Sequence, residues 1–175
     1  MKALGHVFKY GDNVDTDVII PARYLNSSDP KELAAHCMED IDVDFAKNVQ
    51  KGDIMVAKSN FGCGSSREHA ALVPLYLGVK AVITKSFARI HVANLVNAGI
   101  LPFTFVNEED YDKIDQMDEL SLPNIKDAIE NNKPVVLKNI TKGEEYQLDS
   151  SHLSSRQRAM LICGGLLDYT REINK

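Results

Sequence analysis

Residues 53–106 alternate between short apolar runs and longer helical segments, and this alternation restricts the fold more than any other feature. The apolar runs DIMVAK (53–58), KAVITKS (80–86) and ILPFTFV (100–106) have the composition of strands. Between them, SSREHAALVPLYLG and FARIHVANLVNAG have helical composition and end at Gly78 and Gly99. A strand–helix–strand–helix–strand order predicts parallel pairing with right-handed crossovers, and therefore an α/β fold.

Short segments before this alternating region predict further elements. Val7–Tyr10 and Val18–Ile20 have the composition of short strands, and the polar turn GDNVDTD lies between them. A helix is expected to begin at Asp29, because Pro30 and Glu32 follow at the positions preferred in a first helical turn. This helix would continue through LAAHCMED.

The segments after residue 106 predict a solvated stretch, a hairpin and a helical end. Residues 107–120 hold seven acids and one lysine, which is typical of a solvated helix or loop face. PVVLKNITKGEEYQLD predicts a hairpin about Lys142-Gly143. The last segment predicts helices that are interrupted at Gly164-Gly165. Because no linker composition appears anywhere, we expect one domain over residues 1–175.

Composition narrows the class of protein. The 175 residues are 44% hydrophobic and 26% charged, as in an ordinary globular protein. A net charge of −5 argues against nucleic acid and anionic membranes as partners. Neither a membrane-spanning run nor a signal sequence is apparent, so a cytoplasmic location is expected. The three cysteines form no C-x-x-C pair, and Cys37 and Cys163 are expected to be buried as small hydrophobes.

The loop NFGCGSSREHAA (60–71) holds the densest set of polar and small residues at a predicted strand-to-helix turn. One interpretation is structural: Ser65 and Glu68 have the spacing of a capping box. The other is that the helix N-terminus, two serines and Arg67 bind a small carboxylate or phosphate. The phosphate-loop and dinucleotide-binding patterns both fail here, since neither the G-K-[ST] nor the third glycine is present.

Four segments together resemble the aconitase superfamily. They are GDNVDTDVIIPARYL (11–25), NFGCGSSREHAA (60–71), SFARIHVANLVNAGILP (86–102) and CGGLLDYTRE (163–172). The resemblance is to the swivelling domain, which in split enzymes is a separate small subunit, and it covers nearly the whole chain. It implies a single β/β/α domain of the aconitase C-terminal type and a hydro-lyase that isomerises a hydroxy acid by dehydration and rehydration.

The resemblance also implies roles for individual residues. Ser65 matches the base that removes a proton from the substrate carbon, and Gly64, Ser66 and Arg67 match substrate-binding positions. Asp17 matches an active-site aspartate. It would orient Arg67 or a group of the partner subunit, or only order the DNVDTD turn.

A [4Fe-4S] cluster is implied as the Lewis acid of the reaction, carried by the large subunit of a heterodimer or heterotetramer. This chain is then expected to bind no metal and to be inactive alone. The general acid is implied on the large subunit as well, so His69 and His91 are expected to be structural. Cys63 would pack in the loop or face the site without binding iron. Arg89 is compatible with support of the site or of the interface.

The resemblance implies a variable loop after Tyr24-Leu25, here Asn26-Ser27-Ser28-Asp29, that contacts the distinguishing group of the substrate. The expected substrate contacts in this region are Tyr24, Leu25, Asn26 and Ser27. No cation occurs from residue 24 to 30, which favours an uncharged branch such as isopropyl over the third carboxylate of citrate or homocitrate. Dimethylmalate-type substrates, which also have an uncharged branch, remain open. Two features leave citrate-type acids open: Arg23 lies next to this segment in sequence, and residues 86–105 resemble single-chain aconitases as much as they resemble the split enzymes. A non-catalytic anion-binding module is the alternative from another class of protein.

Overall fold

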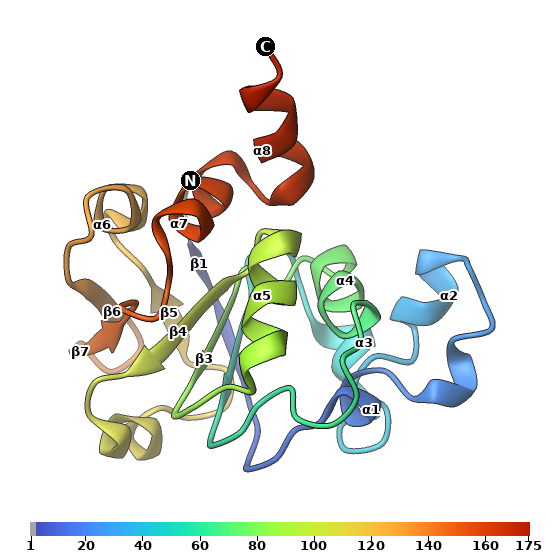
Figure 1. Ribbon diagram of the computed structural model, residues 1–175. Helices are drawn as coiled ribbons and strands as arrows, with labels where there is room; N and C mark the ends of the chain where they lie inside the picture. Colours follow the sequence, from blue (N-terminus) through green and yellow to red (C-terminus); the bar gives the residue numbers. More distant parts are fainter. Residues whose placement is uncertain (1–2) are drawn as a thin grey trace.

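A computed structural model describes residues 3–175, and within them seven strands close into a barrel (Figure 1). The parallel half consists of β1 (Leu4–Lys9), β2 (Ile54–Ala57), β3 (Ala81–Thr84) and β4 (Leu101–Phe105). The antiparallel half consists of β5 (Glu119–Ser121), β6 (Val135–Asn139) and β7 (Glu144–Asp149). The barrel is closed where β7 pairs with β4 and β5 pairs with β1, both antiparallel.

Helices cover the outer face of the parallel half and one end of the barrel. In chain order they are α1 (Thr16–Ile19), the 3-10 helix η1 (Ala22–Tyr24), α2 (Pro30–Ala34), α3 (Phe45–Asn48), α4 (His69–Tyr76), α5 (Arg89–Ala98), the 3-10 helix η2 (Glu108–Lys113), α6 (Ile125–Glu130), α7 (Ser155–Cys163) and α8 (Leu166–Ile173). Figure 1 shows α7 and α8 at one end of the molecule and α1 at the other, where the chain leaves β1 and β2. Within residues 3–175, no helix is long and apolar enough to cross a membrane.

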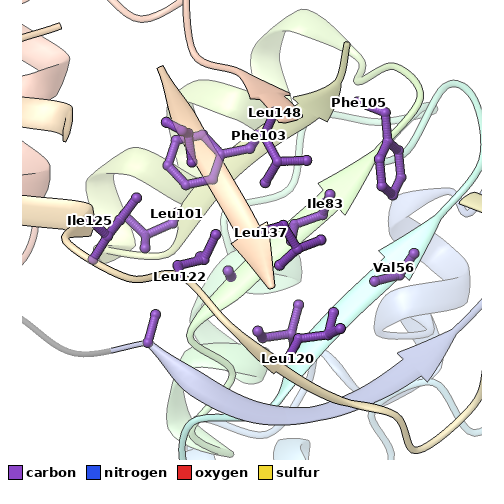
Figure 2. Packing of buried hydrophobic residues seen from close by; sticks show 14 of the residues in the cluster. Val56, Ile83, Leu101, Phe103, Phe105, Leu120, Leu122, Ile125, Leu137 and Leu148 are labelled. Atoms are coloured by element: carbon purple, nitrogen blue, oxygen red, sulfur yellow. The ribbon is translucent and has the colours of Figure 1, made fainter. Parts of the chain in front are cut away.

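Alternating side chains on the parallel strands build two hydrophobic cores. Val56 and Ile83 point into the barrel, where they meet residues of the antiparallel half such as Leu120 and Leu137 (Figure 2). Val7 of β1 belongs to the same cluster. The residues between them, including Phe8, Met55 and Val82, point outward and pack under α2 to α5. The parallel strands are therefore buried on both faces, which explains their continuous apolar sequences. Antiparallel strands, parallel strands and helices form three successive layers, so the expected β/β/α domain is confirmed.

Several sequence-based expectations are confirmed element by element. The three strands of residues 53–106 pair in parallel, and β6 and β7 form the hairpin about Lys142-Gly143. The Asp29 carboxylate accepts the N–H of Lys31 at 3.0 Å and caps α2. Gly164 has a φ of +102°, a left-handed conformation that ends α7 before α8 begins.

Two local expectations are wrong, and one of the two alternatives for Ser65 is excluded. Val18–Ile20 is not a strand, because the Asp15 carboxylate accepts the N–H of Val18 at 2.8 Å and starts α1 instead. The helix that begins after Asp29 ends at Ala34, and turns follow where it was expected to continue. Ser65 does not cap α4, because this helix begins at His69 with Glu68 as its N-cap residue and without a side-chain cap.

The acidic segment 107–120 is only partly solvated. Most of its acids are exposed, but Asp110 and Asp118 are buried. The carboxylate of Asp118 accepts hydrogen bonds from the Asp115 N–H at 2.9 Å and the Asn139 amide at 2.8 Å. These bonds satisfy the buried carboxylate of Asp118. They also fix the turn between η2 and β5 against β6.

Candidate functional site

Three loops meet beyond the carboxyl ends of β1, β2 and β3, the edge where open α/β sheets bind ligands. The N–H of Gly62 donates to the carbonyl of Val14 at 2.7 Å, and the N–H of Thr16 donates to the carbonyl of Cys63 at 3.0 Å. The N–H of Ala88 donates to the carbonyl of Phe61 at 2.9 Å. Backbone hydrogen bonds thus join the loops after all three strands into one unit.

A cavity of about 450 Å³ opens between these loops. Its walls are Thr16, Gly62, Gly64, Ser66 and Arg67 on one side and the first two turns of α5 on the other. This volume suits a small organic acid. Of the residues expected from the sequence, Gly64, Ser66 and Arg67 line it, and so does Arg89, whose role the sequence left open. Ser65 and Asp17 are not part of the lining.

The segment Gly64–Arg67 presents free backbone N–H groups. Among residues 3–175, none accepts a hydrogen bond from the four main-chain N–H groups of this segment. Ser65 and Ser66 are exposed, and the Thr16 hydroxyl holds the loop by donating to the carbonyl of Ser65 at 2.8 Å. Successive free N–H groups in a turn form an anion-binding concavity, so the loop can bind an oxyanion before α4 begins.

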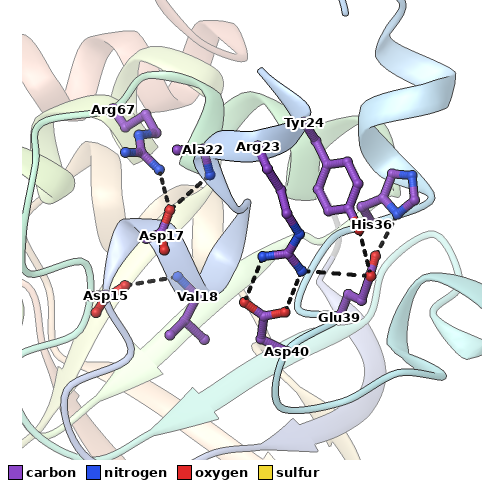
Figure 3. A network of polar contacts seen from close by, with 10 residues as sticks. All are labelled: Asp15, Asp17, Val18, Ala22, Arg23, Tyr24, His36, Glu39, Asp40 and Arg67. Atoms are coloured by element: carbon purple, nitrogen blue, oxygen red, sulfur yellow. Dashed lines mark hydrogen bonds and ion pairs between the residues drawn. The ribbon is translucent and has the colours of Figure 1, made fainter. Parts of the chain in front are cut away.

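Arg67 is held in a fixed direction by two acceptors. Its Nη1 donates to the carboxylate of Asp17 at 3.2 Å (Figure 3). The same nitrogen donates to the carbonyl of Ile20 at 3.1 Å. Within the described residues no contact occupies its Nη2 and Nε, which leaves one edge of the guanidinium for a carboxylate. The Ala22 N–H and then Arg67 lower the pKa of Asp17, so this carboxylate stays charged. Asp17 therefore both orders its turn and orients Arg67.

Gly62 and His91 fit together beneath the loop. Gly62 has a φ of +81°, and a Cβ on this residue would lie 2.2 Å from Cγ of His91. The imidazole is only 2% exposed and packs against the Phe61 ring, with 5.5 Å between the ring centroids. Neither of its nitrogens has a hydrogen-bond partner in the described part of the chain, and burial lowers its pKa to about 4. His91 is thus a neutral packing partner of the loop.

The Tyr24–Ser27 segment lies beside this site and outside the cavity lining. The Tyr24 ring stacks on His36 at 3.7 Å, and its hydroxyl donates to Glu39 at 2.7 Å (Figure 3). The Ser27 hydroxyl donates to Glu32 at 2.8 Å. These contacts tie the segment to α2 and the turns that follow it.

Arg23 is already paired with acids. Its guanidinium donates to Asp40 at 2.6 Å and approaches Glu39 at 3.8 Å (Figure 3). The cation nearest to the Tyr24–Ser27 segment in sequence is therefore neutralised in this structure.

The cysteines do not fit an iron–sulfur cluster. Cys37 is buried, while Cys63 and Cys163 lie half-buried on different elements. Burial raises the pKa of the Cys63 thiol, and the nearby Asp15 carboxylate adds to this, whereas a cluster ligand must be a thiolate. Residues 3–175 contain no group of three or more His, Cys, Asp and Glu that could hold a metal ion.

Several residues of the site were not foreseen as contributors from the sequence, and Thr16 and His91 are the two with the clearest contacts. Thr16 joins the first two loops through its N–H and hydroxyl, and its position between Asp15 and Asp17 in the D-T-D motif was the available signal. His91 was noticed only as a structural histidine. Its packing under Gly62 depends on the third loop, which no local pattern describes.

Fold and site together define a β/β/α domain with a loop of free N–H groups and an arginine at the carboxyl edge of its parallel strands. Residues 8–108 match the Aconitase C-terminal domain family. The chain belongs to this family.

Within this family, the chain is similar over nearly its whole length to small subunits of dehydratases. The 3-isopropylmalate dehydratase small subunit of Clostridium beijerinckii is 57% identical over 171 residues, which cover 98% of this chain and 99% of the relative. The 2,3-dimethylmalate dehydratase small subunit of Eubacterium barkeri is 46% identical over the full length of both chains. The crystal structure of 3-isopropylmalate dehydratase from Methanocaldococcus jannaschii superimposes with a TM-score of 0.86 at 39% identity, covering 99% of this chain and 96% of that one.

Proposed function

We propose that this chain is the small subunit of a 3-isopropylmalate dehydratase. This hydro-lyase interconverts 2-isopropylmalate and 3-isopropylmalate by dehydration and rehydration, a step of leucine biosynthesis. The observation that carries the proposal is the Arg67 site, with its free N–H groups and its 450 Å³ cavity, in a chain 57% identical to such a small subunit from end to end. Three free thiols suit the reducing cytoplasm in which we place the protein.

The residues of the loop take separate roles in this proposal. Arg67 and Ser66 bind a substrate carboxylate, and Asp17 positions Arg67. Ser65 is the base that removes the proton from carbon. A serine hydroxyl is a weak base, so its alkoxide needs stabilisation, which the free N–H groups of Gly64–Arg67 can supply.

The remaining parts of the active site belong to a large subunit in this proposal. The names of the relatives imply such a partner. Since the cysteines of this chain do not fit a cluster, we assign the [4Fe-4S] cluster and the general acid to the large subunit. The complex is a heterodimer or heterotetramer, and the small subunit alone is inactive.

The charge pattern around Tyr24–Ser27 supports a substrate with an uncharged branch. No cation occurs from residue 24 to 30, and Arg23 is paired with Asp40. A third substrate carboxylate would therefore meet no partner in this segment. We assign Tyr24, Leu25, Asn26 and Ser27 to the isopropyl side of the substrate, which they would reach when the segment closes on the bound acid.

The direct test is an assay of the chain reconstituted anaerobically with its large subunit. Isopropylmalate, dimethylmalate, citrate and homocitrate are compared side by side. We expect isopropylmalate to give the highest kcat/KM. A higher value for citrate or homocitrate would contradict the assignment of the Tyr24–Ser27 segment. A higher value for 2,3-dimethylmalate would favour the second candidate function, which the 46% identity to a 2,3-dimethylmalate dehydratase small subunit supports.

The base assignment is tested by Ser65→Ala in the same complex. Turnover should fall by about 10²–10⁴-fold while KM changes little, because proton transfer acts only in the transition state. Ser155→Ala, an exposed serine on α7, is the matched control and should retain full activity. Turnover of Ser65→Ala within about threefold of the wild type would refute the role of Ser65 as the base.

A further inference from the structure

Three lysines gather at the mouth of the barrel, on the three strands whose loops build the Arg67 site. Lys9 is the last residue of β1, and Lys58 and Lys85 directly follow β2 and β3. Each stands two residues after an inward-pointing residue, namely Val7, Val56 and Ile83. Because side chains alternate along a strand, all three lysines share the interior face of the barrel at its carboxyl end.

Their ammonium groups converge on one aromatic ring. The Nζ atoms of Lys9, Lys58 and Lys85 lie 4.3, 5.5 and 5.3 Å from the centroid of Tyr111. Lys9 Nζ is therefore within about 10 Å of each of the other two Nζ atoms, and those of Lys58 and Lys85 are within about 11 Å of each other. These limits are close to the Debye length of about 8–10 Å, so salt screens the repulsion between the half-buried charges only in part. The Tyr111 hydroxyl donates to the Tyr10 carbonyl at 2.6 Å, so the ring is a fixed platform.

The three charges have no acidic partner in residues 3–175. All three lysines are half-buried, and none has a carboxylate within 4.0 Å. Burial raises the pKa of the Tyr111 hydroxyl, and the nearby carboxylates of Asp112 and Asp12 raise it further. Neither carboxylate forms an ion pair with these lysines. Asp12 instead accepts the N–H of Ser59 at 3.0 Å.

Cation–π contacts compensate the cluster only in part. Each such contact contributes about 0.5–1 kcal/mol at a partly exposed site, and one ring cannot neutralise three ammonium groups. A chain with a net charge of −5 nevertheless brings these cations together. An anion bound between them would reduce the repulsion and accept charge-assisted hydrogen bonds from the lysine side chains that turn toward it.

We propose that Lys9, Lys58 and Lys85 form a second anion site, which binds a small oxyanion, a carboxylate or a phosphate. The site is separate from the Arg67 site, because none of the three lysines lines the cavity beside Arg67. Since each lysine lies at the start of one of the three loops that build that cavity, an anion bound here also stabilises the arrangement of the loops.

The test uses the isolated chain with amide NMR, in an Arg67→Gln background that removes the first anion site. Malonate, citrate and inorganic phosphate are titrated against sodium chloride at equal ionic strength. We expect saturable shifts of the amides of residues 9–12, 58–60, 85–86 and 111, which chloride does not reproduce. The expected affinity is in the millimolar range, as for small anions held by partly exposed lysines.

Lysine variants assign the binding. The shifts should disappear in Lys9→Gln/Lys58→Gln/Lys85→Gln and persist in Lys31→Gln/Lys47→Gln/Lys126→Gln, which removes the same charge from exposed sites elsewhere. If the first triple variant does not fold, Lys58→Gln and Lys85→Gln alone should each weaken binding by about threefold or more.

Two results would overturn the proposal. One is a shift that chloride reproduces or that both triple variants retain. The other is an absence of small-anion binding while the Lys9, Lys58 and Lys85 variant loses affinity for the large subunit, since the lysines would then pair with acidic side chains of the partner. Because the measurement needs neither turnover nor a cluster, its failure is distinguishable from failure of the proposed function.

Discussion

At the scale of single residues, the orientation of Arg67 depends on its two contacts through Nη1. One acceptor is the carbonyl of Ile20, which is fixed by the backbone, and the other is the carboxylate of Asp17. Asp17 is itself fixed by the N–H of Ala22 at 2.8 Å. The free edge of the guanidinium is thus directed by α1 and the turn that follows it, and not by the loop that carries Arg67.

Asp17→Asn tests this positioning role. The amide oxygen still accepts from Ala22, so the turn should keep its conformation, but the charge that holds Arg67 is lost. KM of the reconstituted enzyme should rise by about threefold to fivefold, while kcat falls less. Arg67→Lys should raise KM further, because an ammonium cannot make the two-pronged contact. An unchanged KM in Asp17→Asn would show that Ile20 alone suffices to orient Arg67.

The residues to which we assign the chemistry could be selected from the sequence, but most of their contacts could not. Ser65, Ser66, Arg67 and Asp17 stand in motifs that identify them in the chain, and the Asp17–Arg67 contact was one of the alternatives foreseen. The packing of His91 against Gly62 was not foreseeable, because it requires the relative placement of two loops.

At the scale of elements, the loop after β2 depends on two glycines with different surroundings. Both have left-handed conformations, with φ of +81° at Gly62 and +89° at Gly64. A Cβ at Gly62 would overlap the His91 ring, whereas at Gly64 the nearest atom would be 3.6 Å away, in ordinary contact. A side chain at Gly62 is therefore disfavoured both by the backbone conformation and by packing, whereas at Gly64 it is disfavoured by the conformation alone.

Gly62→Ala should therefore be far more damaging than Gly64→Ala. The left-handed conformation costs about 1–2 kcal/mol at either position, and the overlap with His91 raises the loss at Gly62 to about 3 kcal/mol or more. Thermal unfolding should show a fall in Tm of about 6–12 °C for Gly62→Ala and about half of that or less for Gly64→Ala. Equal losses in the two variants would mean that the His91 contact contributes nothing to stability.

Elements with a strong local pattern were predictable, and elements set by a single contact were not. Strands β2 to β4 and the β6–β7 hairpin follow from apolar runs and turn residues. By contrast, α1 has four residues and exists because Asp15 caps it, so its apolar Val18–Ile20 segment resembled a strand. The capping-box spacing of Ser65 and Glu68 also does not correspond to a helix cap, because α4 begins later, at His69.

At the scale of the whole molecule, closure of the barrel was beyond what the sequence could tell. It depends on β5, a strand of three residues, which pairs with β1 across more than half of the chain. Local periodicity carries no information about such a partner. The closure nevertheless matters for the proposed second anion site, because it brings η2 and its Tyr111 beside the lysines of the three site loops.

The global stability of the fold should depend on the protonation of His91. In the unfolded chain this imidazole takes up a proton near pH 6.5, but in the folded chain burial lowers its pKa to about 4. The folded state therefore binds fewer protons between these two values, and the free energy of unfolding falls as the pH falls through this window. The stabilisation from the neutral ring is fully present above about pH 6.5. The expected loss by pH 4 is about 3 kcal/mol.

Urea unfolding of the isolated chain between about pH 7 and pH 4 measures this loss. In His91→Leu, which keeps a similar volume without a titrating group, about 3 kcal/mol of the pH dependence should be absent. His69→Gln is the matched control, because His69 is exposed, and it should follow the wild-type profile. Parallel profiles for the wild type and His91→Leu would contradict a neutral buried imidazole. The ring would then take up its proton in the folded state over the same pH range as in the unfolded chain, and below that range the charged ring beside Gly62 would need an acidic partner.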